Sequence, residues 1–326
     1  MSTTSNKKKS SKAHTNVHSV KYNVDKTRVL KALVRIPEHD ILEGTVSIAS
    51  YAFRNCKRLT SITIPDSMRI IGKYAFACCE RIRDIAIPAN VESIGEGALA
   101  YCYNLNTIVV ADENKYYDSR NNCKAIIETK SNTLIAGCMF TTIPNDVNKI
   151  GNCAFKGCLA LTKISIPDCV SEIGIDAFSC CRFLKTINIP KNITQIGSCA
   201  FWHCENLTSI TIPAGVTKIE DATFFYCKNL SSICMPSSIT SIGNIAFRGC
   251  KSLVSVIVPD GVKNLGEEVF SFCDKLTTIS LPNSITSIAG GSLGRCKNLQ
   301  SIIIPKGSKK KFSMLLPEHT NIFVEQ

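Results

Sequence analysis

Cysteine and histidine are the residue types in this sequence that could bind a metal or act as nucleophiles. The 326 residues include 18 cysteines and 5 histidines, and His203 stands beside Cys204 with Cys199 five residues before it. Zinc sites typically show cysteine pairs of the form C-x2-C, and the sequence has none. Reduced cysteine also serves as a small apolar core residue. We therefore expect no metal site and no cofactor.

Catalytic motifs are missing as well. The sequence has no G-x-S-x-G, no P-loop, no H-E-x-x-H and no paired-carboxylate signature. Four of the five histidines lie toward the two ends of the chain, and only His203 stands among the repeats described next. We expect a protein that is not an enzyme.

Ten of the cysteines occupy one recurring position. Most prolines recur with the same 23-residue period, from Pro65 to Pro305. The step from Ala111, which takes the slot after Pro88, to Pro144 is longer than this period, so one unit carries an insertion. The ten, called the ladder cysteines below, are Cys56, Cys79, Cys102, Cys158, Cys181, Cys204, Cys227, Cys250, Cys273 and Cys296.

Each unit predicts one short helical segment and one short strand. In residues 190–212 the apolar side chains first follow helical spacing. Ile210 and Ile212 then alternate with Ser209 and Thr211, which is the period of a strand with one buried face. A glycine that follows the inner Ile or Leu, such as Gly197, is expected where the backbone turns into the helical segment with a positive φ. The helical face consists of Ile196, Ala200, Phe201, Cys204 and Leu207.

A unit this short cannot bury a core alone, so the units must stack with each strand parallel to its equivalent in the next unit. The predicted fold class is an α/β repeat solenoid that forms a curved rod. Residues 1–31 hold +7 of the net charge of +12, and residues 1–28 are predicted to form a basic, disordered tail. The solenoid is expected over residues 29–305, with a capping unit at 29–64 and a hairpin insertion at about 112–143.

The unit L-x-x-I-x-I-P-x-x-V-x-x-I-G-x-x-A-F-x-x-C, repeated over residues 44–305, closely resembles that of the BspA-like leucine-rich repeat proteins. The inserted segment Tyr116 to Pro144 is similar to one found in that family, and residues 306–326 resemble its C-terminal cap. The resemblance implies a parallel sheet on the concave face and short helical segments on the convex side. It also implies a protein-binding solenoid, which in this family is often an adhesin on a microbial surface.

The sequence supports three functional hypotheses. The first is a non-enzymatic module that presents a Ser/Thr-rich concave sheet to a protein partner of unknown identity. The second is a surface or secreted adhesin that binds host proteins, and the third is a structural component tethered by its basic tail. Residues 1–20 lack a signal peptide and no apolar run is long enough to span a membrane, so a cytoplasmic location is favoured, with export by an unrecognised route as the alternative. The oligomeric state is left open.

Two surfaces are candidate binding sites. The outward strand positions include Thr186, Asn188, Ser209 and Thr211 and form what we call the Ser/Thr face. Ser and Thr also suit any solvent-exposed sheet, and no aromatic or Arg anchor stands on this face, which favours a non-functional, solvated face as the alternative. The second surface, called the aromatic patch, consists of Trp202, His203, Phe225 and Tyr226. Aromatic side chains exposed in this way mark contact sites, and packing between adjacent units is the alternative.

Two further features have weaker implications. A row of Lys and Arg follows the ladder cysteines, but acidic residues interrupt it, which favours a solvated edge over a nucleic-acid site. Cys123 and Cys138 flank the predicted hairpin, which turns near residues 130–132, and could face one another across it. They are therefore the candidate disulfide in a chain whose other cysteines we expect to be free.

Overall fold

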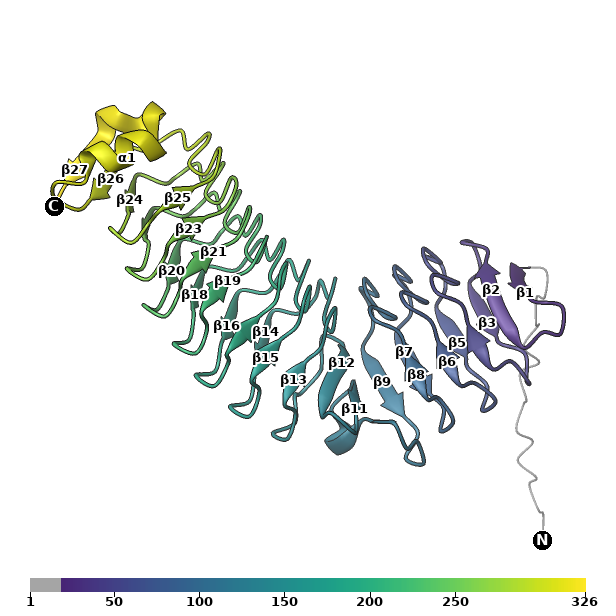
Figure 1. Cartoon of the computed structure of the whole chain (residues 1–326). Coiled ribbons are helices and arrows are strands. Elements are labelled where there is room, and N and C mark those ends of the chain that lie inside the picture. The colour runs from purple at the N-terminus through teal and green to yellow at the C-terminus, as the bar shows by residue number, and fades with distance from the viewer. Residues whose placement is uncertain (1–18) are drawn as a thin grey trace, which may run out of the picture.

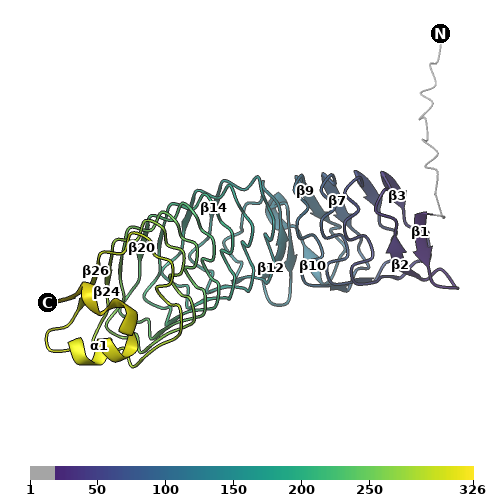
Figure 2. The same cartoon turned by 90° about the horizontal axis from the view of Figure 1, so that it is seen from above.

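The computed structural model describes residues 19–326, which form a curved rod of stacked turns (Figure 1). From β3 to β9, and again after the insertion, strands of three or four residues alternate with strands of two residues. Figure 2 shows β3, β7, β9, β14 and β20 along one edge of the rod and β2, β10 and β12 along the other. The first row contains β3 (Glu38–Asp40), β5 (Ser61–Thr63), β7 (Asp84–Ile87), β9 (Thr107–Val110), β14 (Lys163–Ser165), β16 (Thr186–Asn188), β18 (Ser209–Thr211), β20 (Ser232–Cys234), β22 (Ser255–Ile257), β24 (Thr278–Ser280) and β26 (Ser301–Ile304). The second contains β2 (Arg28–Ala32), β4 (Ser47–Ile48), β6 (Ile70–Ile71), β8 (Ser93–Ile94), β13 (Lys149–Ile150), β15 (Glu172–Ile173), β17 (Gln195–Ile196), β19 (Lys218–Ile219), β21 (Ser241–Ile242), β23 (Asn264–Leu265) and β25 (Ser287–Ile288).

The strand register follows the 23-residue period. In the pairing of β18 with β20, which is parallel, Ile210 lies opposite Ile233 and Thr211 opposite Cys234. Ile210 is buried while Ser209 and Thr211 are exposed, as the alternation predicts. The predicted parallel solenoid and its register are therefore confirmed.

Stacked phenylalanines fill the centre of the rod. From Phe155 to Phe270 one ring per unit stacks on the next, with centroids 5.1 to 5.5 Å apart and nearly parallel planes. Leu99 occupies this slot in the unit before the insertion. The buried side chains form two clusters, one on each side of the insertion, so the core is continuous within each half of the rod.

The ladder cysteines are hydrogen-bond donors as well as apolar core residues. In eight units the thiol lies 3.1 to 3.3 Å from the carbonyl oxygen of the core residue 26 positions earlier, a phenylalanine in every case, as in Cys227 to Phe201. A buried carbonyl without a partner is costly, and the thiol supplies a donor in little more space than an alanine side chain needs. The burial of these residues was predicted from the sequence, but their hydrogen bond was not.

The expected short helix is a series of hydrogen-bonded turns, which we call the turn rung. In residues 72–79 the amides of Ala75, Ala77 and Cys79 donate to the carbonyl three residues earlier. The intervening amides, those of Tyr74, Phe76 and Cys78, donate to the next unit instead, at 2.9 to 3.1 Å. Every second amide can point along the rod because Tyr74 and Cys78 take positive φ values of 51° and 60°. A helix would direct all of these amides within its own turn.

Glycines after the inner Ile or Leu have a different role from the one expected. Gly197 and its equivalents do not have positive φ; a Cβ at Gly197 would lie 2.6 Å from the amide nitrogen of Ile175 in the preceding unit. The backbones of adjacent units approach too closely there for a side chain. The positive φ values belong to two other slots of the turn rung, which hold Tyr, Cys, His and Asp as well as Gly.

Gly197→Ala tests this close approach. We expect it to lower the free energy of unfolding by about 1 to 3 kcal/mol, because the two backbones must separate locally. Gly290→Ala is the matched control, since a Cβ there meets no atom within 4 Å. Urea denaturation of both variants measures the difference, and equal stabilities would contradict the role of close approach.

The chain ends are closed by different elements. The predicted tail extended to residue 28, but Val20–Tyr22 form β1, which pairs antiparallel with β2. Val20 is only 3% exposed, so its burial holds this segment on the first turn. The remainder of the predicted tail, residues 1–18, lies outside the described residues. At the other end α1 (Lys309–Leu315) and the 3-10 helix η3 (Pro317–Ile322) lead into β27 (Phe323–Glu325), which adds to β26 as a parallel strand.

The insertion contains the expected hairpin. It comprises β10 (Tyr117–Asp118), the 3-10 helix η2 (Arg120–Asn122), β11 (Ala125–Glu128) and β12 (Thr133–Gly137), with β11 antiparallel to β12 and β12 parallel to β13. Cys123 and Cys138 are both buried free thiols. Cys123 packs into the core cluster of the C-terminal half and Cys138 into that of the N-terminal half. This placement favours two separate thiols over the predicted disulfide.

Candidate functional site

The Ser/Thr face is hollowed beside the insertion. Thr186 and Asn188 of β16 line a groove of about 640 Å³ together with Lys163 and Ser165 of β14. Asn188 and Thr211 line a second hollow of about 510 Å³, between Pro190 and Pro213. Three of the four residues predicted on this face therefore line one or both hollows, whereas Ser209 lies outside them.

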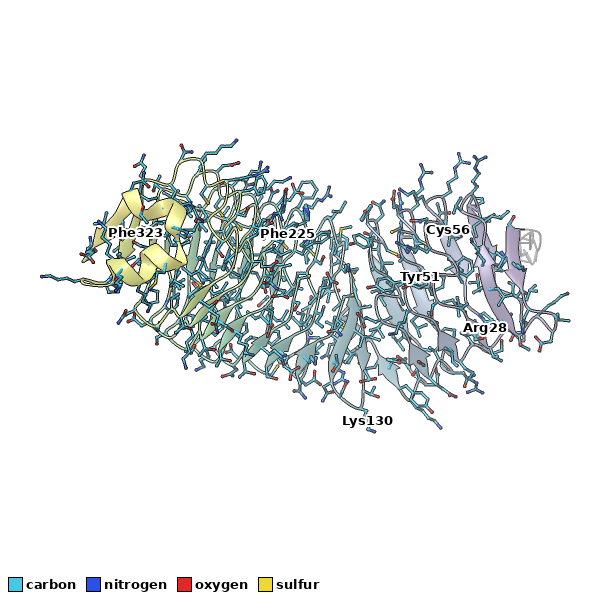
Figure 3. All side chains as sticks on the ribbon, turned by 45° about the horizontal axis from the view of Figure 1, so that its top comes forward. Arg28, Tyr51, Cys56, Lys130, Phe225 and Phe323 are labelled. Atoms are coloured by element: carbon cyan, nitrogen blue, oxygen red, sulfur yellow. The ribbon has the colours of Figure 1, made fainter. Side chains whose placement is uncertain are left out.

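The residues of the aromatic patch are in mutual contact. The rings of Trp202 and Phe225 stack at 6.1 Å, and those of His203 and Tyr226 at 5.1 Å. All four side chains are half-buried. The rings are partly exposed, as expected, and they also pack between adjacent turns, so whether this patch is a contact site stays a prediction. Figure 3 shows Phe225 and Cys56 toward the upper edge of the rod, with the hairpin tip Lys130 at the lower edge.

His203 and Tyr226 stand at backbone positions with positive φ. His203 and Tyr226 have φ of 57°, in the slot of the turn rung directly before the ladder cysteine. Their amides donate along the rod to the next unit, at 2.8 Å in both cases, which holds the backbone in this conformation. The rings are therefore fixed by the backbone of two successive turns.

Two arginines extend the patch, and the sequence analysis missed their role. The guanidinium of Arg248 lies 6.0 Å from the ring centroid of Phe225 and 5.1 Å from that of Phe272, and Arg295 lies 5.0 Å from Phe272. Arg248 also forms an ion pair with Glu268. The signal was present in the sequence, because Arg248 and Phe225 are one period apart, as are Arg295 and Phe272.

Glu205 is the charged centre beside the aromatic patch. Its carboxylate lies 2.8 Å from Lys228 Nζ, 3.2 Å from His203 Nδ1 and 3.5 Å from Arg182 Nε. Partial burial raises the pKa of Glu205, but the hydrogen bonds from Lys228 and His203 outweigh it, and the pKa lies below its ordinary value. The carboxylate is therefore ionised at neutral pH and orients the His203 ring.

Acidic residues neutralise much of the basic row that follows the ladder cysteines. Lys57 pairs with Glu80 at 2.8 Å and Lys251 with Asp274 at 3.5 Å, each across one unit. Lys228 and Arg182 pair with Glu205 in the same way. These cations therefore bind carboxylates of the adjacent turn and do not form a free row for the phosphates of a nucleic acid. The geometry supports the solvated-edge interpretation of this row.

Family comparisons agree with the repeat geometry. The family model described as BspA type leucine rich repeat region, which comprises six copies of the repeat, matches residues 31–140, 136–240 and 217–316. The chain belongs to this BspA-type leucine-rich repeat family. The resemblance drawn from the 23-residue unit is confirmed. A search of curated proteins finds no match.

One solved leucine-rich repeat structure shares the fold, and two further solved structures match with lower TM-scores. One from Eubacterium ventriosum is 26% identical, with a TM-score of 0.63, over 80% of this chain and 83% of that one. A leucine rich cell surface protein from Faecalibacterium prausnitzii is 25% identical, with a TM-score of 0.48, over 86% of this chain and 62% of that one. The pneumococcal vaccine antigen PcpA is 21% identical, with a TM-score of 0.47, over 83% and 57% of the two chains.

Two structural features concern metal binding and membrane insertion in this BspA-type protein. Within residues 19–326 no group of three or more His, Cys, Asp or Glu side chains is arranged to hold a metal ion. Over the same residues no helix has the length and apolar character needed to cross a membrane.

Proposed function

We propose that this BspA-type repeat protein is a non-enzymatic interaction module that binds another protein. The observation that carries the proposal is the aromatic patch with its adjoining arginines. Trp, Tyr and Arg dominate the energetics of protein interfaces, because they combine a large contact area with few rotatable bonds or with bidentate hydrogen bonding. Such residues on one fixed, partly exposed surface form a site that a partner can bind without reordering it.

The Ser/Thr face is the second part of the proposed interface, and we expect it on the concave side of the rod. This face offers hydroxyl and amide groups at regular spacing, from Thr186, Asn188, Ser209 and Thr211. The grooves beside Thr186, Asn188 and Thr211 increase the area that a partner can cover. A polar face of this kind supplies specificity through hydrogen bonds more than affinity.

Affinity purification with matched variants tests the proposal. Immobilised wild type is compared with Trp202→Ala/Tyr226→Ala, and the recovered protein is then purified and titrated against both. We expect the double variant to weaken binding by at least about 30-fold, because two anchor side chains of this kind each contribute roughly 1 to 2 kcal/mol or more. The control Thr186→Ala/Asn188→Ala is expected to lose less than about tenfold.

Unchanged affinity in the Trp202→Ala/Tyr226→Ala variant would exclude the aromatic patch as the interface. Loss in the Thr186→Ala/Asn188→Ala control alone would move the interface to the Ser/Thr face. Cell fractionation separates the interaction module from a surface adhesin, and deletion of residues 1–18 tests tethering through the basic tail.

A further inference from the structure

A pocket of about 320 Å³ on the turn rungs lies in the N-terminal half of the rod, apart from the proposed interface. It is lined by three tyrosine rings, by the small side chains of Ala77 and Cys78, and by two cations. Its volume falls in the range of small-molecule sites, which combine aromatic walls with a few polar groups. The lining residues are Tyr51, Arg54, Tyr74, Ala77, Cys78, Tyr101 and Lys156.

The missing turn rung of the insertion creates this pocket. In regular units an amide of the turn rung donates to the next unit along the chain, but Tyr101 donates to the carbonyl of Lys156, two units on, at 2.8 Å. Tyr101 and Tyr74 therefore reach over the seam between the halves. Gly157 provides room, because a Cβ there would lie 2.3 Å from the Tyr101 ring. Gly97 does the same for Tyr74, with a Cβ at 2.5 Å from its ring.

The aromatic walls are held in place before any ligand binds. The hydroxyl of Tyr74 lies 3.3 Å from the thiol of Cys153, and that of Tyr101 lies 3.8 Å from the thiol of Cys180. The ring of Tyr51 stacks on that of Tyr74 at 5.5 Å with nearly parallel planes. A ring that enters this pocket meets fixed aromatic surfaces, so little conformational entropy is lost on binding.

The charged residues of the pocket determine which kind of aromatic ligand it favours. Tyrosine-lined cages often bind cations, but here Arg54 and Lys156 line the pocket and no acid does. Lys156 is neutralised by Asp176 at 2.7 Å. Arg54 lies over the Tyr51 ring and has no carboxylate within 4.0 Å among residues 19–326. A free guanidinium at the rim of an aromatic pocket favours an anion attached to the ring.

We propose that this pocket binds an aromatic ring that carries a phosphate or carboxylate group, with the ring against Tyr51 and Tyr74 and the anion on Arg54. The same chemistry is offered by a free aromatic acid or aryl phosphate and by a phosphotyrosine side chain. This pocket is separate from the aromatic patch, so ligand binding in it can be tested independently of the proposed function.

Isothermal titration calorimetry with phenyl phosphate as the probe tests the proposal. Phenol carries the ring without the charge, and inorganic phosphate carries the charge without the ring. We expect phenyl phosphate to bind at least about tenfold more tightly than either, since both contacts contribute. Acetyl-phosphotyrosine amide is the additional arm: tighter binding than phenyl phosphate assigns the site to a protein side chain, and equal or weaker binding assigns it to a free small molecule.

Variants at exposed positions separate this binding from general effects. Arg54→Gln is expected to weaken phenyl phosphate binding at least about tenfold and to leave the weak phenol binding unchanged. Tyr51→Ala, at a side chain 49% exposed, is expected to weaken both ring-containing probes. Arg58→Gln is the control, because Arg58 is exposed on the same unit and does not line the pocket. The absence of phenyl phosphate binding at millimolar concentration, or full binding by Arg54→Gln, would overturn the proposal.

Discussion

Ile210→Asp is expected to lower the free energy of unfolding by at least about 3 kcal/mol, whereas Thr211→Asp changes it by less than about 1 kcal/mol. Ile210 is 4% exposed and packs between the equivalent isoleucines of the neighbouring turns, Ile187 and Ile233. A carboxylate there loses its water and finds no cation. Thr211 lies on the same strand with its side chain in solvent, so the same substitution leaves the new charge hydrated.

Urea denaturation measures this contrast. Trp202 is the single tryptophan of the chain and lies in the turn rung just before this strand, so its fluorescence reports on the same part of the rod. Far-ultraviolet circular dichroism follows the rest. Similar losses at positions 210 and 211 would contradict the strand register, because the two residues would then have comparable surroundings.

Stability is expected to fall steeply at alkaline pH because of the ladder cysteines. Burial raises the thiol pKa at eight of these positions, to about 12 at Cys102 and Cys158 and about 11 at Cys296, from the ordinary 9.0. Above pH 9 the unfolded chain therefore releases protons that the folded protein retains, which favours unfolding as pH rises. Each thiol contributes about 1 kcal/mol between pH 9 and pH 10, because its ionisation in the unfolded chain rises from about half to about nine-tenths, so eight remove on the order of 8 kcal/mol.

A serine variant provides the matched control for this effect. Cys204→Ser/Cys227→Ser/Cys250→Ser keeps a hydroxyl donor for the phenylalanine carbonyls but removes three titrating groups. Between pH 9 and pH 10 each thiol is on average about three-quarters ionised in the unfolded chain, so the three substitutions should reduce the slope of unfolding free energy against pH by about two protons. An unchanged slope would show that other groups cause the alkaline transition.

The repeat period was sufficient to predict the rod, the strand register and the core. The alternation around Ile210 and the spacing of Phe201 and Cys204 reflect burial, and burial is what side-chain patterns encode. The period was not sufficient to predict backbone conformation. His203 and Tyr226 adopt positive φ although neither is glycine, because backbone bonds to the next turn compensate for the strain.

The candidate sites were predictable only in part. The aromatic patch follows from the sequence, since Trp202 and Phe225 are one period apart and both rings fall outside the apolar stripe. The tyrosine pocket does not, because it depends on Tyr101 reaching Lys156 across a missing turn rung. Tyr101 and Lys156 are neighbours there, and no regular period relates them. Interruptions of a repeat therefore create local geometry that the repeat itself does not encode.

The hydrogen bonds between turns have a consequence for how such a chain can change in length. At successive regular turns the amides of the turn rung donate toward the C-terminal neighbour, and the ladder thiols donate toward the N-terminal one. Each regular boundary therefore presents the same set of donors and acceptors as the next. If a whole 23-residue unit is duplicated or lost at such a boundary, the hydrogen bonds between the newly adjacent turns form again. The gene can therefore gain or lose whole repeats without leaving backbone groups of the protein unpaired. The seam at residues 112–143 lacks this equivalence, which makes it the fixed point around which the two halves can vary independently.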